Sequence, residues 1–241
     1  MIDPRAAIIG ERLAGVRRIV AVTGGKGGIG KSLVSCLFAT VAAERGLRTG
    51  LFDLDLTSPT DHVILGAPMG FPSEEHGIDP AMCDGVRLMS IAMFSGSTPA
   101  PLRGAALTGA LLELLAITRW GELDLLVLDM PPGLGDTALD AMRYLPRCEY
   151  LVVSTPSIVV RETVRRMVQL LGERHASILG LVENFQSGDV APSHELAAEF
   201  QLRWLPGVPY DKSLEAAIGD VAGLRRTDAA KAVGRIVDEL G

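Results

Sequence analysis

A glycine-rich segment near the start of the chain carries the pattern of a phosphate-binding loop. Residues 25–32 read Gly-Lys-Gly-Gly-Ile-Gly-Lys-Ser, which matches G-x-x-x-x-G-K-[ST], and they lie between an apolar run and a helix-like stretch. Glycines let backbone N–H groups turn toward phosphate oxygens, and the N-terminus of the following helix favours negative charge. We therefore predict that Lys31 contacts the β- and γ-phosphates of a nucleotide and that the Ser32 hydroxyl binds Mg²⁺.

The loop contains a second lysine, Lys26, which this pattern does not require. Its ammonium group is a candidate for neutralising further phosphate charge, and the alternative is a solvated loop charge. The residues of this segment that we predict to bind nucleotide are Gly25, Lys26, Gly27, Gly28, Ile29, Gly30, Lys31, Ser32 and Leu33.

Two short apolar runs end in carboxylates. Asp129 follows one run, at the place where a strand end holds Mg²⁺ or a water bound to it. Asp53 and Asp55 end the other run. We assign Asp53 to the Mg²⁺ ligands and favour Asp55 as the group that orients the attacking water, because it lies further beyond the strand end. Spacing leaves either carboxylate open for the water, and capping of the next turn is the alternative for each. The predicted catalytic residues are Lys26, Lys31 and Asp55.

The segment after Asp129 combines prolines, which restrict the backbone, with glycines, which allow many backbone conformations. Residues 130–136 read Met-Pro-Pro-Gly-Leu-Gly-Asp. Such a composition suits a loop with two discrete arrangements. We interpret it as the sensor of the γ-phosphate.

Short apolar runs alternate with segments of helical periodicity along the chain. This alternation predicts an α/β fold, a doubly wound and mostly parallel sheet flanked by helices. The predicted strands are 18–23, 49–53, 86–91, 124–129, 150–154, 178–182 and 203–208. The predicted helices are 31–44, 105–118, 157–171, 193–200, 213–218 and 228–240. We expect one domain over 1–241, with a lead segment at 1–15 and a proline-rich insertion of loops and one short helix at 58–85.

Composition excludes several classes of protein. The chain has 241 residues with 23 Lys+Arg and 29 Asp+Glu, a net charge of −6, which disfavours a nucleic-acid role. Its apolar runs are far shorter than the roughly 20 residues that span a bilayer, and its first residues contain no secretory apolar segment. The three cysteines have neither metal-finger nor redox spacing, and their odd number fits a reducing compartment. We expect a cytoplasmic protein without integral membrane contact.

Taken together, these motifs resemble the deviant-P-loop ATPases of the MinD, ParA and nitrogenase-iron-protein group, and within it the Mrp/ApbC-type iron–sulfur carrier ATPases. The resemblance begins near Val16 and continues to the end of the chain. Its specific markers are Trp-Gly-Glu-Leu-Asp at 120–124 and Pro-Pro-Gly-x-Gly-Asp at 131–136. It also rests on Lys-Gly-Gly-Ile-Gly-Lys-Ser at 26–32, Asp-x-Asp at 53–55, Val-Glu-Asn at 182–184 and Pro-Tyr-Asp at 209–211.

The resemblance implies a homodimer that encloses two ATP molecules, with Lys26 of each subunit reaching the nucleotide of the other. It also implies that Asn184 and the turn Pro209-Tyr210-Asp211 flank the adenine. An asparagine just past a strand end offers a donor and an acceptor to a base edge, and a capping or turn role is the alternative.

One departure concerns the cargo of such carriers. In Mrp/ApbC-type proteins the Val-Glu-Asn segment is followed by Cys-x-x-Cys, through which two subunits share a cluster, whereas residues 185–194 of this chain contain no cysteine. Cys83, in the predicted insertion, is the remaining candidate ligand.

The leading hypothesis is an Mg²⁺-dependent ATPase that acts with a client apo-protein or assembly factor in iron–sulfur cluster or metal-cofactor assembly. The alternative is a ParA- or MinD-like switch that binds DNA, membrane or a partner protein.

Overall fold

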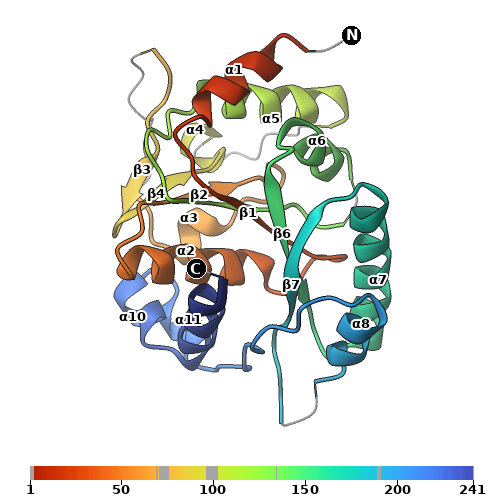
Figure 1. Ribbon diagram of the computed structural model, residues 1–241. Helices are drawn as coiled ribbons and strands as arrows, with labels where there is room; N and C mark the ends of the chain where they lie inside the picture. The colour runs from red at the N-terminus through yellow and green to blue at the C-terminus, as the bar shows by residue number, and fades with distance from the viewer. Residues whose placement is uncertain are drawn as a thin grey trace.

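The sheet at the centre of the molecule is mostly parallel, as the alternating sequence pattern predicts. The computed structural model describes residues 3–68, 70, 76–95, 103–133, 135–188 and 191–240. Within these ranges the strands follow the order β3-β4-β2-β5-β1-β6-β7, and only β3 runs antiparallel to its neighbour (Figure 1). The strands are β1 Ile19–Thr23, β2 Thr49–Asp53, β3 Ala81–Cys83, β4 Val86–Met89, β5 Leu125–Asp129, β6 Cys148–Ser154 and β7 Ser177–Glu183.

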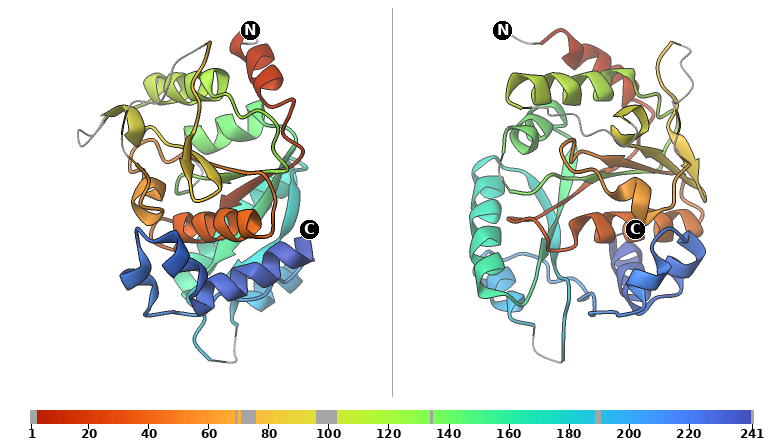
Figure 2. Two further views of the ribbon diagram at one scale, coloured as in Figure 1. Left: turned by 90° about the vertical axis from the view of Figure 1, so that its left-hand side faces the viewer. Right: turned by 180° about the vertical axis from the view of Figure 1, so that it is seen from behind.

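Helices cover both faces of this sheet. They are α1 Arg5–Arg12, α2 Lys31–Glu44, α3 Asp61–Ile64, α4 Ala92–Ser95, α5 Ala105–Ile117, α6 Asp136–Tyr144, α7 Ile158–Glu173, α8 Ser193–Glu199, α9 Leu214–Ala217, α10 Val221–Arg225 and α11 Asp228–Leu240. Figures 1 and 2 show α1, α5 and α6 on one face and α2, α10 and α11 on the other, with α7 and α8 beside β6 and β7.

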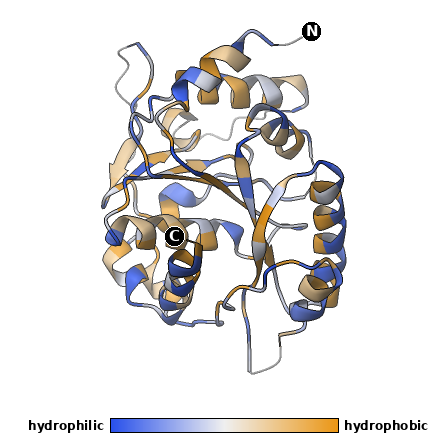
Figure 3. Ribbon diagram, in the orientation of Figure 1, coloured by the Kyte–Doolittle hydropathy of each residue, from blue (hydrophilic) through white to orange (hydrophobic). Residues whose placement is uncertain are grey.

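Burial on both faces explains the apolar sequence of the central strands. Every residue of β1, β2 and β5 is buried. In Figure 3 apolar residues follow the sheet, whereas outer helices such as α7 also carry polar residues. No helix formed by the described residues is long and apolar enough to cross a membrane.

Strand register brings the predicted chemical groups to one edge. Asp129, the last residue of β5, pairs with Asp53 at the end of β2 and with Val22 near the end of β1. Because these strands are parallel, their carboxyl ends lie side by side. The segments that follow them therefore share one region of the surface.

The structure corrects several predicted elements. Residues 203–208 do not form a strand, and the nearby contacts are isolated bridges from Trp204 to Leu181 and from Pro209 to Gln186. Prolines at 206 and 209 lack the N–H donors that a continuous ladder needs. The predicted insertion at 58–85 contains β3 as well as the short helix α3, although positions 69 and 71–75 lie outside the described residues.

Other differences concern helices that the sequence pattern did not predict. The lead segment contains α1, and α4, α6 and α10 were not expected. The four helices have 8, 4, 9 and 5 residues, too short for a clear helical period. The predicted γ-phosphate sensor at 130–136 leads into α6, and its Leu134 lies outside the described residues.

Candidate nucleotide and cation site

The glycine-rich loop connects β1 to α2, which is the strand–loop–helix context that its sequence predicts. Gly28 and Gly30 have φ angles of 76° and 81°, a backbone region that favours glycine. A Cβ placed on Gly30 would lie 2.2 Å from Nδ2 of Asn184, and one on Gly25 would lie 2.3 Å from the carbonyl carbon of Thr163. Close packing therefore leaves no room for side chains at Gly25 and Gly30.

The two loop lysines differ in exposure. Lys31 is buried, and its Nζ donates to the carbonyl oxygen of Lys26 at 3.2 Å. Burial lowers the pKa of Lys31, while the negative charges of Asp129 and Asp55 act in the opposite direction. Lys26 is exposed, which is compatible both with a solvated charge and with a contact to another molecule.

Asp129 and the predicted Mg²⁺ ligand Ser32 are in direct contact. The Ser32 hydroxyl donates to Oδ2 of Asp129 at 2.6 Å, and the Ser35 hydroxyl donates to Oδ1 at 2.8 Å. Burial raises the pKa of Asp129 to about 6, although both serine hydroxyls stabilise the carboxylate. The hydroxyl and the carboxylate are oxygen donors, the type that Mg²⁺ prefers.

Asp53 organises the backbone beyond β2. Its two carboxylate oxygens accept hydrogen bonds from the N–H groups of Asp55, Thr60 and Asp61 at 3.1, 3.1 and 3.4 Å. The Ser90 hydroxyl donates to Oδ2 at 3.2 Å. Burial, and then the charge of Asp129, raises the pKa of Asp53 to about 8.

Asp55 makes the turn contacts that the sequence left open as its alternative role. Its Oδ1 accepts hydrogen bonds from N and Oγ1 of Thr57 at 3.3 and 2.8 Å and from N of Ser58 at 3.1 Å. These contacts engage one carboxylate oxygen. Its role toward water stays a prediction.

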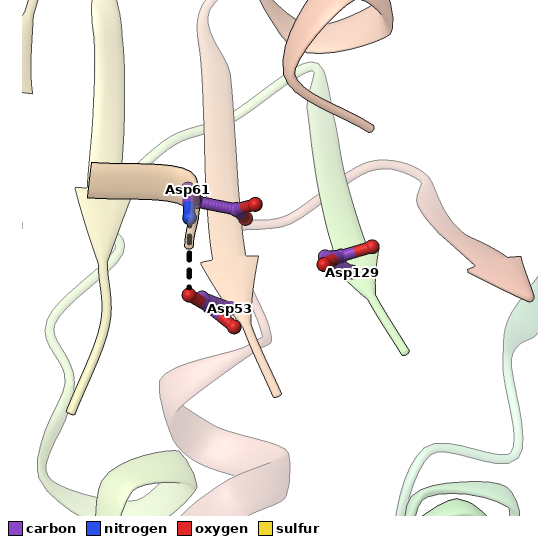
Figure 4. A group of neighbouring side chains, drawn as sticks. All are labelled: Asp53, Asp61 and Asp129. Carbon is purple, nitrogen blue, oxygen red and sulfur yellow. Dashed lines mark hydrogen bonds between the residues drawn. The ribbon is translucent and has the colours of Figure 1, made fainter. Parts of the chain in front are cut away.

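Sequence reasoning missed a third carboxylate at this edge, Asp61. In Figure 4 its side chain, on α3, points toward Asp53 and Asp129, and one oxygen from each residue lies within 4.8 Å of the other two. Asp61 is fully buried, and burial raises its pKa well above the ordinary value, followed by the charges of Asp129 and Asp53. Asp61 lies in the proline-rich segment without periodicity, so no sequence pattern indicates its burial.

Asn184 contacts the glycine-rich loop, whereas Tyr210 and Asp211 of the predicted adenine turn make contacts with other parts of the chain. Nδ2 of Asn184 donates to the carbonyl oxygen of Ile29 at 2.9 Å. Tyr210 is 61% exposed, and its ring meets that of Phe185 edge-on at 6.3 Å. The Asp211 carboxylate accepts hydrogen bonds from N–H groups at the starts of α9 and α11, as a capping residue does.

Cys83 lies away from this group. It belongs to β3 at the far edge of the sheet, with β4 and β2 between it and β5. Burial raises the pKa of its thiol to about 11. The other cysteines, Cys36 and Cys148, are also free and buried, and they come from α2 and β6.

Comparison with known sequences finds iron–sulfur carriers. A ParA family model described as NUBPL iron-transfer P-loop NTPase matches residues 15–222. The iron-sulfur cluster carrier protein of Mycobacterium tuberculosis is 39% identical over 168 residues, which cover 69% of this chain and 44% of the relative. The protein of the same name from Pseudomonas fragi is 37% identical, and the match covers 71% of this chain and 61% of that relative. The one from Aquifex aeolicus is 32% identical, and the match covers 83% of this chain and 60% of that relative. The chain thus spans 44–61% of the length of these curated relatives.

Comparison with solved structures finds nucleotide-binding proteins. A nucleotide-binding protein from Archaeoglobus fulgidus in complex with ADP has a TM-score of 0.74 at 26% identity, with 92% of this chain and 93% of that chain covered. The cell division ATPase MinD of Pyrococcus furiosus has a TM-score of 0.69 at 21% identity, with 92% and 98% covered. The second likeness shows the shared fold.

Proposed function

We propose that the protein is an Mg²⁺-dependent ATPase acting in iron–sulfur cluster or metal-cofactor assembly, because the chain belongs to the ParA family of NUBPL-type iron-transfer P-loop NTPases. The observation that carries the ATPase proposal is the Ser32–Asp129 hydrogen bond at 2.6 Å, beside the buried Lys31. This contact supports the proposal, because it joins a hydroxyl and a carboxylate beside an ammonium group in a loop whose sequence is typical of phosphate and Mg²⁺ binding.

Each group of the loop has a separate task in this proposal. Backbone N–H groups of residues 25–33 bind the phosphate oxygens, and Lys31 neutralises charge on the β- and γ-phosphates. Ser32, Asp53 and Asp129 would hold Mg²⁺ in this proposal. Bound Mg²⁺ supplies positive charge to the transferring phosphoryl group.

Hydrolysis also requires a positioned water. Asp55 is half-buried beyond β2, and its carboxylate accepts hydrogen bonds from Thr57 and Ser58 at Oδ1, so we assign its second oxygen to orienting the water. The exposed Lys26 reaches the nucleotide of a second subunit in a homodimer, and Asn184 with residues 209–211 borders the adenine. Positioning and charge stabilisation account for the catalysis, so turnover is slow without a partner protein.

The proposal for the cargo rests on the relatives. Proteins 32–39% identical are named iron-sulfur cluster carrier protein, and the chain matches them over only part of their length. Its three cysteines come from α2, β3 and β6, so one subunit does not gather a thiolate site. A client apo-protein or assembly factor therefore supplies cluster ligands, unless Cys83 of two subunits meets.

Two measurements test the proposal. Mg²⁺-dependent release of phosphate from ATP should be lost in Lys31→Ala and Ser32→Ala but retained in Lys231→Ala, an exposed lysine on α11. Iron and sulfide should then be measured per chain after anaerobic reconstitution, with and without ATP and an apo-protein acceptor. Absence of ATP turnover would exclude the ATPase, and turnover without any effect of ATP on iron transfer would exclude the carrier.

A further inference from the structure

Asp61 is a buried carboxylate that the proposed ATPase chemistry does not use. It has 0% exposed surface, and neither carboxylate oxygen has a hydrogen-bond partner among the described residues. Figure 4 shows its side chain directed at Asp53 and Asp129. One oxygen of each lies within 4.8 Å of the other two. A carboxylate in this position needs a proton or a cation, because an unpartnered buried charge is strongly unfavourable.

Its two neighbours are stabilised in a way that Asp61 is not. The Asp53 carboxylate accepts hydrogen bonds from three N–H groups and one hydroxyl. Each oxygen of the Asp129 carboxylate accepts a hydrogen bond from a serine hydroxyl. Such donors favour the ionised form. Asp61 therefore faces two carboxylates that each accept two or more hydrogen bonds, whereas the side-chain donor near its own carboxylate is the weak Cys36 thiol.

Among the described residues, no basic side chain forms an ion pair with Asp61. None of the ion pairs at 4.0 Å or less within the described ranges involves any of the three aspartates. The charge of Lys31 acts on Asp129 and Asp55, and in the proposed function its ammonium group turns to phosphate. The Cys36 thiol lies near Asp61, but a thiol is a weak neutral donor and balances no charge.

We propose that Asp53, Asp61 and Asp129 hold a hard divalent cation in the nucleotide-free protein. Carboxylate oxygens are the ligands that Mg²⁺, Mn²⁺ and Ca²⁺ prefer. Three oxygens spread evenly around one ion lie about 4–4.5 Å apart for Ca²⁺ and about 3.6 Å apart for Mg²⁺. The three oxygens, which lie within 4.8 Å of one another, therefore need only a small closure to bind Ca²⁺ and a larger one to bind Mg²⁺.

This site differs from the Mg²⁺ site of the proposed ATPase. It is formed by the chain alone, includes Asp61 and needs neither ATP nor the Ser32 hydroxyl. The two sites share Asp53 and Asp129, and this is the only respect in which the inference rests on the proposed function. The two proposals can therefore fail separately.

The test uses Mn²⁺ as the probe, on the full chain freed of nucleotide and treated with chelator. Loss of the free Mn²⁺ signal in electron paramagnetic resonance counts the bound ion. We expect about one Mn²⁺ per chain, displaced by Ca²⁺ and by Mg²⁺, and at least about tenfold weaker binding by Asp61→Asn. Glu215→Gln, which makes the same charge change at an exposed position, is the control and should bind as the wild-type protein does.

The outcomes are distinct. If Asp61→Asn fails to fold, as judged by its unfolding transition, Asp61→Ser replaces it, and the wild-type stoichiometry remains decisive. Wild-type protein without bound Mn²⁺ at millimolar concentration, or a folded Asp61 variant that binds like wild type, would overturn the cation site and leave a proton on Asp61. Mn²⁺ uptake without ATP turnover would overturn the ATPase alone, and turnover without uptake would overturn this inference alone.

Discussion

The charge of Asp61 decides how a substitution there changes stability. In chelator, Asp61→Asn is expected to raise the unfolding midpoint by about 2–4 °C, because an amide carries no charge into a site where the carboxylate has no partner. In saturating Mn²⁺ the wild-type protein should have the higher unfolding midpoint, because it binds the cation more tightly than Asp61→Asn does. Scanning calorimetry of both proteins under both conditions measures this difference. A variant less stable than wild type in chelator would show that Asp61 has a favourable partner without a cation.

Burial makes the Cys83 thiol a poor nucleophile near neutral pH. Its pKa is raised to about 11, so only a small fraction is thiolate at pH 8. Alkylation of Cys83 by iodoacetamide in the folded chain should therefore be slow at pH 8 and accelerate by about tenfold per pH unit up to pH 10. Mass spectrometry of the labelled peptide measures the rate, and the urea-unfolded chain is the control. Fast labelling of the folded chain at pH 8 would instead show an accessible thiolate that is free to bind iron.

At the scale of elements, Gly30 constrains the loop between β1 and α2 in two ways. Gly30 combines a φ of 81° with an approach that would place a Cβ 2.2 Å from Nδ2 of Asn184. Gly30→Ala should therefore lower the free energy of unfolding by about 1–3 kcal/mol and weaken nucleotide binding at least tenfold, because the loop must shift. Isothermal titration with ATP and urea unfolding measure both effects.

Gly172→Ala provides the matched control for this prediction. Gly172 lies near the end of α7, is exposed, and a Cβ there would meet nothing within 4 Å. The same substitution should leave ATP binding unchanged and stabilise the helix by about 0.5–1 kcal/mol. If Gly30→Ala and Gly172→Ala changed ATP binding and the free energy of unfolding equally, the loop would tolerate alanine and Gly30 would have no special role.

Elements with a strong apolar signal were predictable, and those stabilised by distant contacts were not. The run at 49–53 and the periodic segment 31–44 coincide with β2 and α2, and the family resemblance is confirmed by the family match. By contrast, 203–208 carries apolar residues yet makes only isolated bridges, since Pro206 and Pro209 interrupt the ladder. The three-residue strand β3 is defined by its partner β4, and no local pattern indicates it.

The same distinction applies to the candidate site. The loop pattern and the strand-end position indicated Ser32 and Asp129, and the structure brings them into contact. Asp61 was missed because its burial depends on how the short helix α3 packs against α2 beside the end of β2. Spacing also did not distinguish the roles of Asp53 and Asp55, because the turn contacts of Asp55 and the four donors to Asp53 exist only in the folded chain.

At the scale of the whole molecule, the exposure of Lys26 raises the question of a second subunit. Lys31 lies inside the loop, whereas Lys26 points its charge outward in a chain that carries a net charge of −6. An exposed lysine in a phosphate loop can neutralise a phosphate that another molecule presents to it. The homodimer proposed above supplies that phosphate.

Separate effects of Lys26 and Lys31 on binding and turnover test this arrangement. Lys26→Ala should bind ATP within about threefold of wild type but lose turnover by at least about tenfold, because a cation supplied across an interface acts mainly in the transition state. Lys31→Ala should lose ATP binding itself, because we propose that its ammonium group, which the Lys26 carbonyl oxygen holds at the loop, neutralises the phosphates bound by that loop. Sedimentation velocity with ATP should show dimers of the wild-type chain and of the exposed control Lys231→Ala, and fewer dimers of Lys26→Ala. Wild-type turnover by Lys26→Ala would mean that this lysine is a solvated surface charge and that each chain completes its own site.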